Sequence, residues 1–284
     1  LIVSAGPLSP GFSAGTTTYS LEVLNTTTST TVTATVQDPT ATLTINGAAA
    51  NSGQAFGPIA LNVGPNQVTI IVRALNGATK TYTVTITRAA NVNLASLSLS
   101  AGSPTPPFSP SVTSYTLSVP NETTSTTVTA TVEDATSTLT INGQSVPSGQ
   151  AFGPVALAVG QNTVTILVRA VDGVTTKTYS VTITRAPSSN ALLAGLQVTP
   201  GFMLPVFSPS VTTYTVNGAG LFTAAANVTA TVQEPNASIT INGAAVASGT
   251  TLQVPLTGPS TPITVLVRAQ DQVTTVTYNV TVNR

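Results

Sequence analysis

The sequence predicts an all-β chain made of three tandem antiparallel β-sandwich domains with about seven strands each. Short motifs recur along its 284 residues at intervals of 96–100 residues. Within each interval, apolar residues alternate with threonine, which is the period of a half-buried strand. No segment repeats its apolar residues at the spacing of a helix, so the prediction contains no helical domain.

The repeat covers the whole chain, because three independent motifs give the same spacing. The sequence Ile-Asn-Gly begins at Ile45, Ile141 and Ile241, and the repeated arginine and tyrosine positions are Arg73, Arg169 and Arg268, and Tyr82, Tyr179 and Tyr278. A solenoid unit is only about 20–50 residues long, whereas a sandwich domain is about 100. We therefore predict domains at 1–90, 91–187 and 188–284. The short linkers between them favour a semi-rigid rod.

Strand periodicity is clear in the middle copy. Residues 127–132, 164–169 and 178–184 each alternate between apolar and mostly hydroxyl-bearing side chains. Threonine suits such strands because it is β-branched and its hydroxyl can face water. Asn142-Gly143 and Asp172-Gly173 follow or separate these runs and supply the positive-φ residues that tight turns need.

The charge content excludes several kinds of partner. Only 6% of the residues are charged and the formal net charge is zero, against about 25% charged residues in an average soluble domain. The chain therefore has no basic surface for nucleic acid or for an anionic membrane. Its apolar runs are also far shorter than the roughly 20 residues of a spanning helix, so we predict no membrane insertion.

Catalytic and metal chemistry is not predicted. The chain has no histidine and no cysteine, which removes the usual base for a serine nucleophile and the usual zinc ligands. Asp172 and Asp271 align with Asn76 beside turn residues, so turn formation explains them. Glu133 and Asp134 form the densest carboxylate cluster, but neighbouring strand residues point to opposite faces. We predict a non-enzymatic protein without a cofactor, and an acid–arginine ion pair inside each copy is compatible with the pattern.

Most aromatic residues are explained by the repeat. Eleven of the thirteen fall at repeated positions, which favours packing in the core or at a corner. Only Phe202 and Phe222 stand outside the pattern, and both belong to the third copy.

The motifs resemble one known family. LASLSL at 94–99, FSPSVTSYTL at 108–117, LTING at 139–143, VGQNTV at 159–164 and KTYSVTITR at 177–185 are similar to the bacterial cadherin-like β-sandwich family. All three copies match along their length. The resemblance implies an Ig-like/cadherin-like fold and a secreted or surface-attached bacterial module, often found in tandem. The chain contains none of the Asp-x-Asp strings with which cadherins bind calcium, so the resemblance does not imply a calcium site.

The third copy and the amino terminus supply the candidate self-association residues. Where copy two has GSPTPP at 102–107, copy three has GFMLPV at 201–206, and a longer apolar stretch follows near residue 221. Leu1 aligns with Leu97 and Leu196, so copy one lacks the residues that match Leu94 and Leu193. Either the sequence is a fragment, or the first sandwich is open at one edge, and an open edge can accept a strand from a neighbour. The candidates are Phe202, Met203, Leu204, Leu221, Phe222, Leu1, Ile2 and Val3.

These observations predict a structural protein of the bacterial cell exterior. One hypothesis is the subunit of an extracellular filament, a head-to-tail homopolymer in which the third copy contacts the first copy of the next chain. A second is a rod-like stalk beside neighbouring domains of a larger surface protein. The alternative is an adhesin or carbohydrate-binding module whose copy-three loops hold a glycan.

Overall fold

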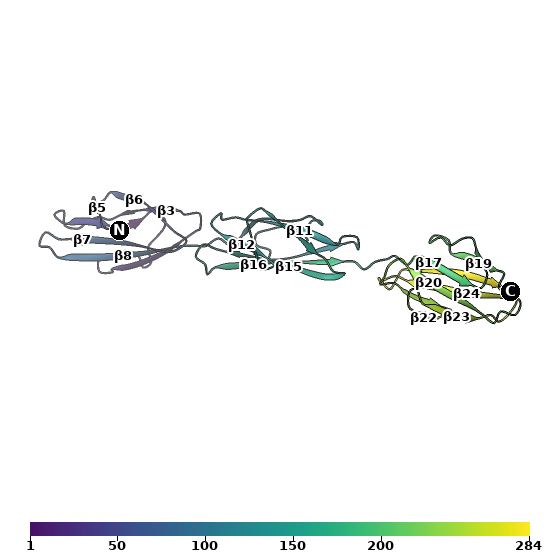
Figure 1. The fold of residues 1–284 in the computed structure, drawn as a ribbon. Coiled ribbons are helices and arrows are strands. Elements are labelled where there is room, and N and C mark those ends of the chain that lie inside the picture. The colour runs from purple at the N-terminus through teal and green to yellow at the C-terminus, as the bar shows by residue number, and fades with distance from the viewer. The chain divides into compact units, whose positions relative to one another are not determined.

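The computed structural model describes all 284 residues, and its regular elements are strands (Figure 1). They form six sheets, two in each predicted copy, and we call the copies repeats 1, 2 and 3. The all-β sandwich class is therefore confirmed, with eight, eight and nine strands rather than about seven. No helix long and apolar enough to cross a membrane is present.

Repeat 1 packs a three-stranded sheet against a five-stranded sheet. In order across the sheet, the first contains β1 (Ile2–Val3), β3 (Ser29–Thr33) and β6 (Ala55–Ala60). The second contains β2 (Thr18–Val23), β8 (Thr79–Arg88), β7 (Gly64–Arg73), β4 (Thr42–Ile45) and β5 (Ala48–Ala50).

Repeats 2 and 3 keep the same two layers. The three-stranded sheet of repeat 2 contains β14 (Ala151–Ala156), β11 (Ser125–Val132) and β9 (Leu94–Leu99). The three-stranded sheet of repeat 3 contains β17 (Leu193–Thr199), β20 (Ala225–Val232) and β23 (Thr251–Pro255). The large sheet of repeat 2 contains β10 (Ser114–Val119), β16 (Thr176–Arg185), β15 (Gly160–Arg169), β12 (Thr138–Ile141) and β13 (Gln144–Val146). That of repeat 3 contains β18 (Phe202–Leu204), β19 (Thr213–Asn217), β25 (Thr275–Asn283), β24 (Ser260–Arg268), β21 (Ser238–Ile241) and β22 (Ala244–Val246).

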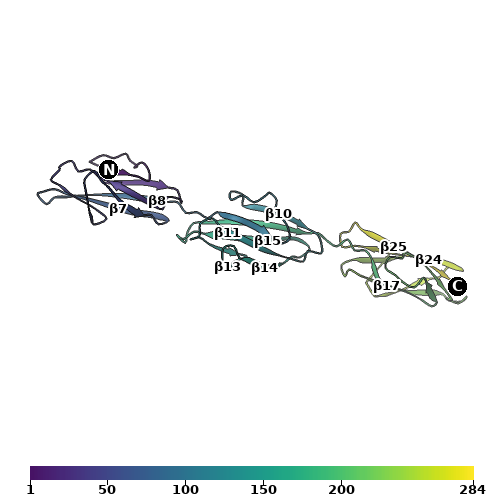
Figure 2. The ribbon, with the colours of Figure 1, turned by 90° about the horizontal axis from the view of Figure 1, so that it is seen from above.

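Each core lies between the two sheets, where the predicted alternation places it. In repeat 2, Val128, Ala130 and Val132 of β11 are buried, whereas the threonines between them lie toward the outer face. The facing strand β15 buries Val164 and Ile166 in the same way. Figure 2 shows β11 and β15 in this repeat from a second direction. The strands predicted at 127–132, 164–169 and 178–184 are thus confirmed.

One detail of the pairing differs from the all-antiparallel expectation. β2 pairs with β8 in parallel over six residues, from Thr18 opposite Thr83 to Val23 opposite Arg88. The corresponding pair in repeat 3, β19 and β25, is also parallel. The chain reaches β2 from β1, which belongs to the other sheet. No hairpin therefore forces β2 to run antiparallel to its neighbour.

Candidate binding surfaces

The repeated tyrosines hold the corner of each sandwich. In repeat 2 the Tyr115 hydroxyl is shared between the carbonyl oxygens of Ser109 at 2.8 Å and Val112 at 2.9 Å. The ring is almost fully buried and stacks on Phe108 with 6.1 Å between the ring centroids. Core and corner packing is thus confirmed for Tyr115 and Phe108.

The repeated arginines bind main-chain carbonyl groups. Arg185 donates from Nε to Asn121 O at 2.7 Å and from Nη1 to Leu157 O at 2.9 Å. The pattern is compatible with an acid–arginine ion pair inside each copy, but Asp134 accepts hydrogen bonds from the backbone N–H and the hydroxyl of Thr136. Arg185 therefore connects segments that are distant in the sequence, whereas the Thr136 contacts of Asp134 close a turn. No group of three carboxylate, histidine or cysteine side chains gathers where it could hold a metal ion.

Asp172 also stabilises a turn by accepting hydrogen bonds within it. Gly173 has a φ of 71°, as expected for this turn, but Asp172 contributes through its carboxylate. The Thr175 hydroxyl donates to Oδ2 at 2.6 Å, and the backbone N–H groups of Thr175 and Val174 donate to Oδ1 at 2.8 and 2.9 Å. These hydrogen bonds, led by that of the Thr175 hydroxyl, hold the pKa of Asp172 below the usual 3.8. Asp271 in repeat 3 is held in the same way.

These hydrogen bonds predict that the stability of repeat 2 depends on the charge of Asp172 only under acid conditions. Because the folded-state pKa is lowered, the stability that Asp172 contributes is complete above pH 3.8 and is lost as the pH falls through the lowered pKa. We expect NMR titration to give both Asp172 and Asp271 carboxyl pKa values below those of Asp in unfolded peptides. Asp172→Asn should make repeat 2 resemble repeat 1, where Asn76 occupies this place. An ordinary pKa for Asp172 would contradict this account.

Repeat 3 carries an exposed apolar surface, which we call the repeat 3 patch and define as Phe202, Leu204, Val206, Leu221 and Phe222. Phe222 is 96% exposed and Phe202 is 64% exposed. β18 pairs with β19, which leads into the loop that carries Leu221 and Phe222. A Cβ built on Gly218 of this loop would lie 3.0 Å from the Phe202 ring, so the two segments meet.

The strand β18 explains why this patch is confined to repeat 3. In repeats 1 and 2 the equivalent segment makes only single bridges, Ser9 with Ser20 and Thr105 with Thr116. Pro7 and Pro104 occupy those segments and have no N–H to donate. In repeat 3, Phe202 stands at the position of Pro7 and Met203 at that of Pro104, and the pairing with β19 extends over three residues.

The other predicted self-association residues lie in different surroundings. Met203 points inward and packs against the core of repeat 3, because it alternates with the exposed Phe202 and Leu204. In repeat 1, Val3 is buried in the core, Leu1 packs against that core, and Ile2 is exposed.

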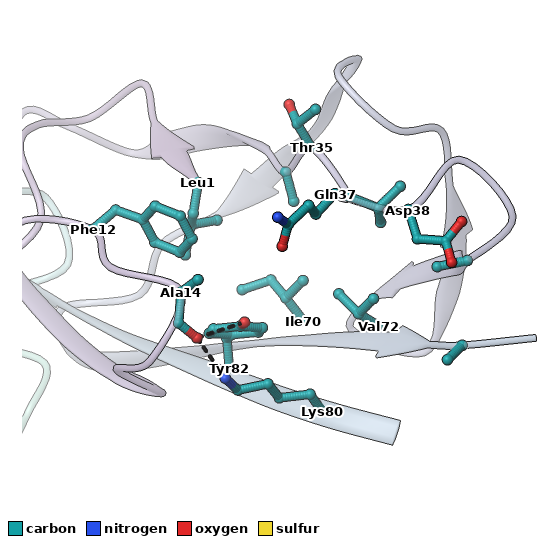
Figure 3. Close-up of a pocket in the computed structure, with 14 residues that line it drawn as sticks. Leu1, Phe12, Ala14, Thr35, Gln37, Asp38, Ile70, Val72, Lys80 and Tyr82 are labelled. Atoms are coloured by element: carbon teal, nitrogen blue, oxygen red, sulfur yellow. Dashed lines mark hydrogen bonds between the residues drawn. The ribbon is translucent and has the colours of Figure 1, made fainter. Parts of the chain in front are cut away.

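A second surface is a groove at one edge of repeat 1, which we call the repeat 1 groove. It has a volume of about 650 Å³, and its floor contains Ile70 and Val72 of β7. Leu1 and Phe12 lie side by side at one end, Asp38 lies at the other with Gln37 between, and Tyr82 lies along the strand side (Figure 3). The Tyr82 hydroxyl and the Lys80 ammonium group both donate to Ala14 O.

Sequence reasoning missed most residues of this groove. The repeat predicts a packing role for Phe12 and Tyr82, yet both line the groove and Phe12 is 48% exposed. The groove combines residues from separate segments between Leu1 and Tyr82, so no local pattern in the sequence marks it.

The repeats match a known family model. The model described as "Cadherin-like beta sandwich domain" matches residues 2–89, 94–186 and 193–284. A protein from Evansella cellulosilytica with the description "Putative membrane protein" is 37% identical over 88 residues, which is 31% of this chain and 13% of that protein. The chain therefore spans only a small part of the length of this relative.

Solved structures of cadherins were also matched. Drosophila N-cadherin EC1-3 has a TM-score of 0.34 at 12% identity, over 94% of this chain and 97% of that chain. Mouse protocadherin-24 EC1-3 has a TM-score of 0.32 at 11% identity, over 96% of this chain and 98% of that chain. With the family model matched three times in succession, this chain belongs to the cadherin-like beta sandwich domain family and carries three tandem copies of that domain.

Proposed function

We propose that this chain is a non-enzymatic structural protein of the bacterial cell exterior that assembles through its ends into filaments. The observation that carries the proposal is the repeat 3 patch. Its five apolar side chains are all exposed, and at the positions of the exposed Phe202 and Leu204 repeat 1 has Pro7 and Ser9 and repeat 2 has Ser103 and Thr105. Exposed apolar patches often mark a contact with another protein.

The surface chemistry of the whole chain supports association. Charged residues make up 6% of the sequence, the net charge is zero and the mean hydropathy is +0.34. Proteins that stay monomeric usually keep a net charge that opposes association. This chain has almost no electrostatic barrier against contact with a second copy.

A head-to-tail arrangement follows from where the two candidate surfaces lie in the sequence. The repeat 3 patch and the repeat 1 groove belong to different repeats and differ in shape, so a contact between them joins unlike surfaces of two chains. Heterologous contacts of this kind extend into open fibres unless the rotation closes a ring. The tandem family assignment supports an extracellular location, which we include in the proposal.

The test is electron microscopy and light scattering of the purified chain, compared with the double variant Phe202→Ser, Phe222→Ser. We expect the wild-type chain to form regular fibres. The double variant should remain monomeric at the same concentration, because two large apolar side chains leave the patch. Its unfolding free energy should change by no more than about 0.5 kcal/mol, as is usual for exposed positions.

Val273→Ser is the matched control, because Val273 is an apolar residue of repeat 3 that is 83% exposed in the turn between β24 and β25. This control should still form fibres. Isolated monomers of the wild-type chain would overturn the filament and favour a stalk beside neighbouring domains. Unchanged fibres in the double variant would show that the repeat 3 patch does not take part in the contact between chains. Binding of a glycan by wild type but not by the double variant would favour the adhesin.

A further inference from the structure

We propose that β23 of repeat 3 pairs edge to edge with β23 of a second copy of this chain, antiparallel and with the two Gln253 residues opposite each other. This pairing would join filaments side by side. The inference rests on the proposed function in one respect. One pair of such short strands binds weakly, and the contact lasts only where assembled chains repeat it many times.

β23 is an edge strand with a regular ladder of hydrogen bonds. The three-stranded sheet of repeat 3 has the order β17-β20-β23, so β23 pairs only with β20. This pairing runs without interruption from Pro255 opposite Ala225 to Thr251 opposite Thr229. The side chains of Thr251, Gln253 and Pro255 are exposed. A regular exposed edge of this kind is a template for pairing with another chain.

The equivalent edges of repeats 1 and 2 are interrupted. In repeat 2, Gly153 and Pro154 lie where the register between β14 and β11 shifts. Repeat 1 has the same Gly-Pro pair and the same shift. In repeat 3 the single residue Gln253 takes their place between Leu252 and Val254, and the register is regular. A bulge and a proline without an N–H protect an edge against a second strand, so the edge of repeat 3 has lost this protection.

The backbone groups of alternate residues of β23 face outward. The N–H of Leu256 donates to Ala224 O at 2.8 Å, on the side of β20. Because backbone groups alternate between the two sides of a strand, every second residue counted back from Leu256 also faces β20. The N–H and C=O groups of Thr251 and Gln253, and the C=O group of Pro255, therefore face the open edge. None of these groups has a partner within the chain.

A second β23 matches these groups. With Gln253 opposite Gln253 of the second copy, each residue donates its N–H to the carbonyl oxygen of the other. Thr251 of each chain then lies opposite Pro255 of the other and donates its N–H to that carbonyl oxygen. Since Pro255 has no N–H, every outward N–H group of both strands is used in this register.

The surroundings of the edge favour the same contact. The three strands of this sheet contain no charged residue, whereas exposed edges are often protected by lysine. The loop that carries Leu221 and Phe222 leads into β20 at Ala225, which lies opposite Pro255. The edge therefore borders the repeat 3 patch, so one face of repeat 3 offers both surfaces to neighbouring chains.

The first test compares fibres of the wild-type chain with those of Gln253→Lys and Gln253→Glu. We expect wild-type fibres to lie in pairs in electron micrographs. Each variant alone should form single fibres, because like charges directly opposite each other repel. Mixing preformed fibres of the two variants should restore the pairs, because opposite charges then face each other. This restoration would not occur if the substitutions had merely damaged the fold.

Gln197→Lys is the matched control. Gln197 is exposed on β17, which forms the other edge of the same sheet. The control introduces the same charge into the same sheet, away from β23, and its fibres should remain paired.

The second test follows the contact without fibres, by NMR of the ¹⁵N-labelled double variant Phe202→Ser, Phe222→Ser. At concentrations well above those of the fibre test, the amide signals of Thr251 and Gln253 should shift with concentration. Adding Gln253→Lys should weaken this association at least about fivefold.

Paired fibres of Gln253→Lys, or single fibres of Gln197→Lys, would overturn the inference. Wild-type fibres that stay single, with no concentration-dependent shift at Gln253, would overturn this inference alone. Shifts at Gln253 in a chain that forms no fibres would overturn only the proposed function.

Discussion

Replacing Tyr115 with alanine is expected to lower the unfolding free energy of repeat 2 by about 3–5 kcal/mol. The side chain is 2% exposed, and its ring lies against Phe108. Truncation would leave a large cavity at the corner of the sandwich and remove the hydroxyl that binds Ser109 O and Val112 O. Urea unfolding of the wild-type chain and the variant, followed by NMR signals of repeat 2, measures the change.

Tyr115→Phe separates the two contributions of this residue. It keeps the ring and removes only the hydroxyl, so the expected loss is about 1–3 kcal/mol from the groups left without a partner. The two other repeats serve as internal references, since Tyr19 and Tyr214 hold their own corners. A phenylalanine variant as unstable as the alanine variant would show that the ring contributes little.

Replacing Arg185 with methionine is expected to lower the unfolding free energy of repeat 2 by about 2–4 kcal/mol. Two hydrogen bonds from a charged group are lost, each of which contributes about 1.5–3 kcal/mol, and the partial exposure of the site moderates the sum. Methionine retains apolar bulk, so the change reports mainly on the carbonyl groups of Asn121 and Leu157. The same urea measurement gives its size.

Arg169→Met is the matched control in the same repeat. Arg169 is exposed and makes a single hydrogen bond, to Gly173 O at 2.7 Å. We expect a loss below about 1 kcal/mol. Similar losses for both variants would mean that Arg185 contributes through its charge rather than through its bonds to the main chain.

The local features of the fold could be predicted because they depend on neighbouring residues. Alternation along β11 gives the buried face, and the Asn142-Gly143 pair gives the turn, with φ values of 49° and 79°. Asn142 also accepts the Thr165 amide through its side chain. The inward direction of Met203 follows from the same alternation once Phe202 is known to be exposed.

The features that depend on distant segments could not be predicted. The parallel partner of β2 lies about 60 residues later in the chain, and no periodicity encodes its direction. Arg185 binds carbonyl groups, which every residue possesses, so its partners leave no signal in the sequence. The repeat 1 groove likewise brings together residues from segments as distant as Phe12 and Tyr82.

The parallel pairing of β2 with β8 determines how repeat 1 would respond to mechanical tension. β2 lies near the beginning of the repeat and β8 ends it, so a pull on the two ends drives these strands in opposite directions along their length. The hydrogen bonds between parallel strands are evenly spaced. The applied force is therefore shared among all of them, and they do not break one after another. β19 and β25 give repeat 3 the same geometry. Such strands yield by sliding as a unit, which would suit the proposed filament or a stalk, since either would carry tension along its length.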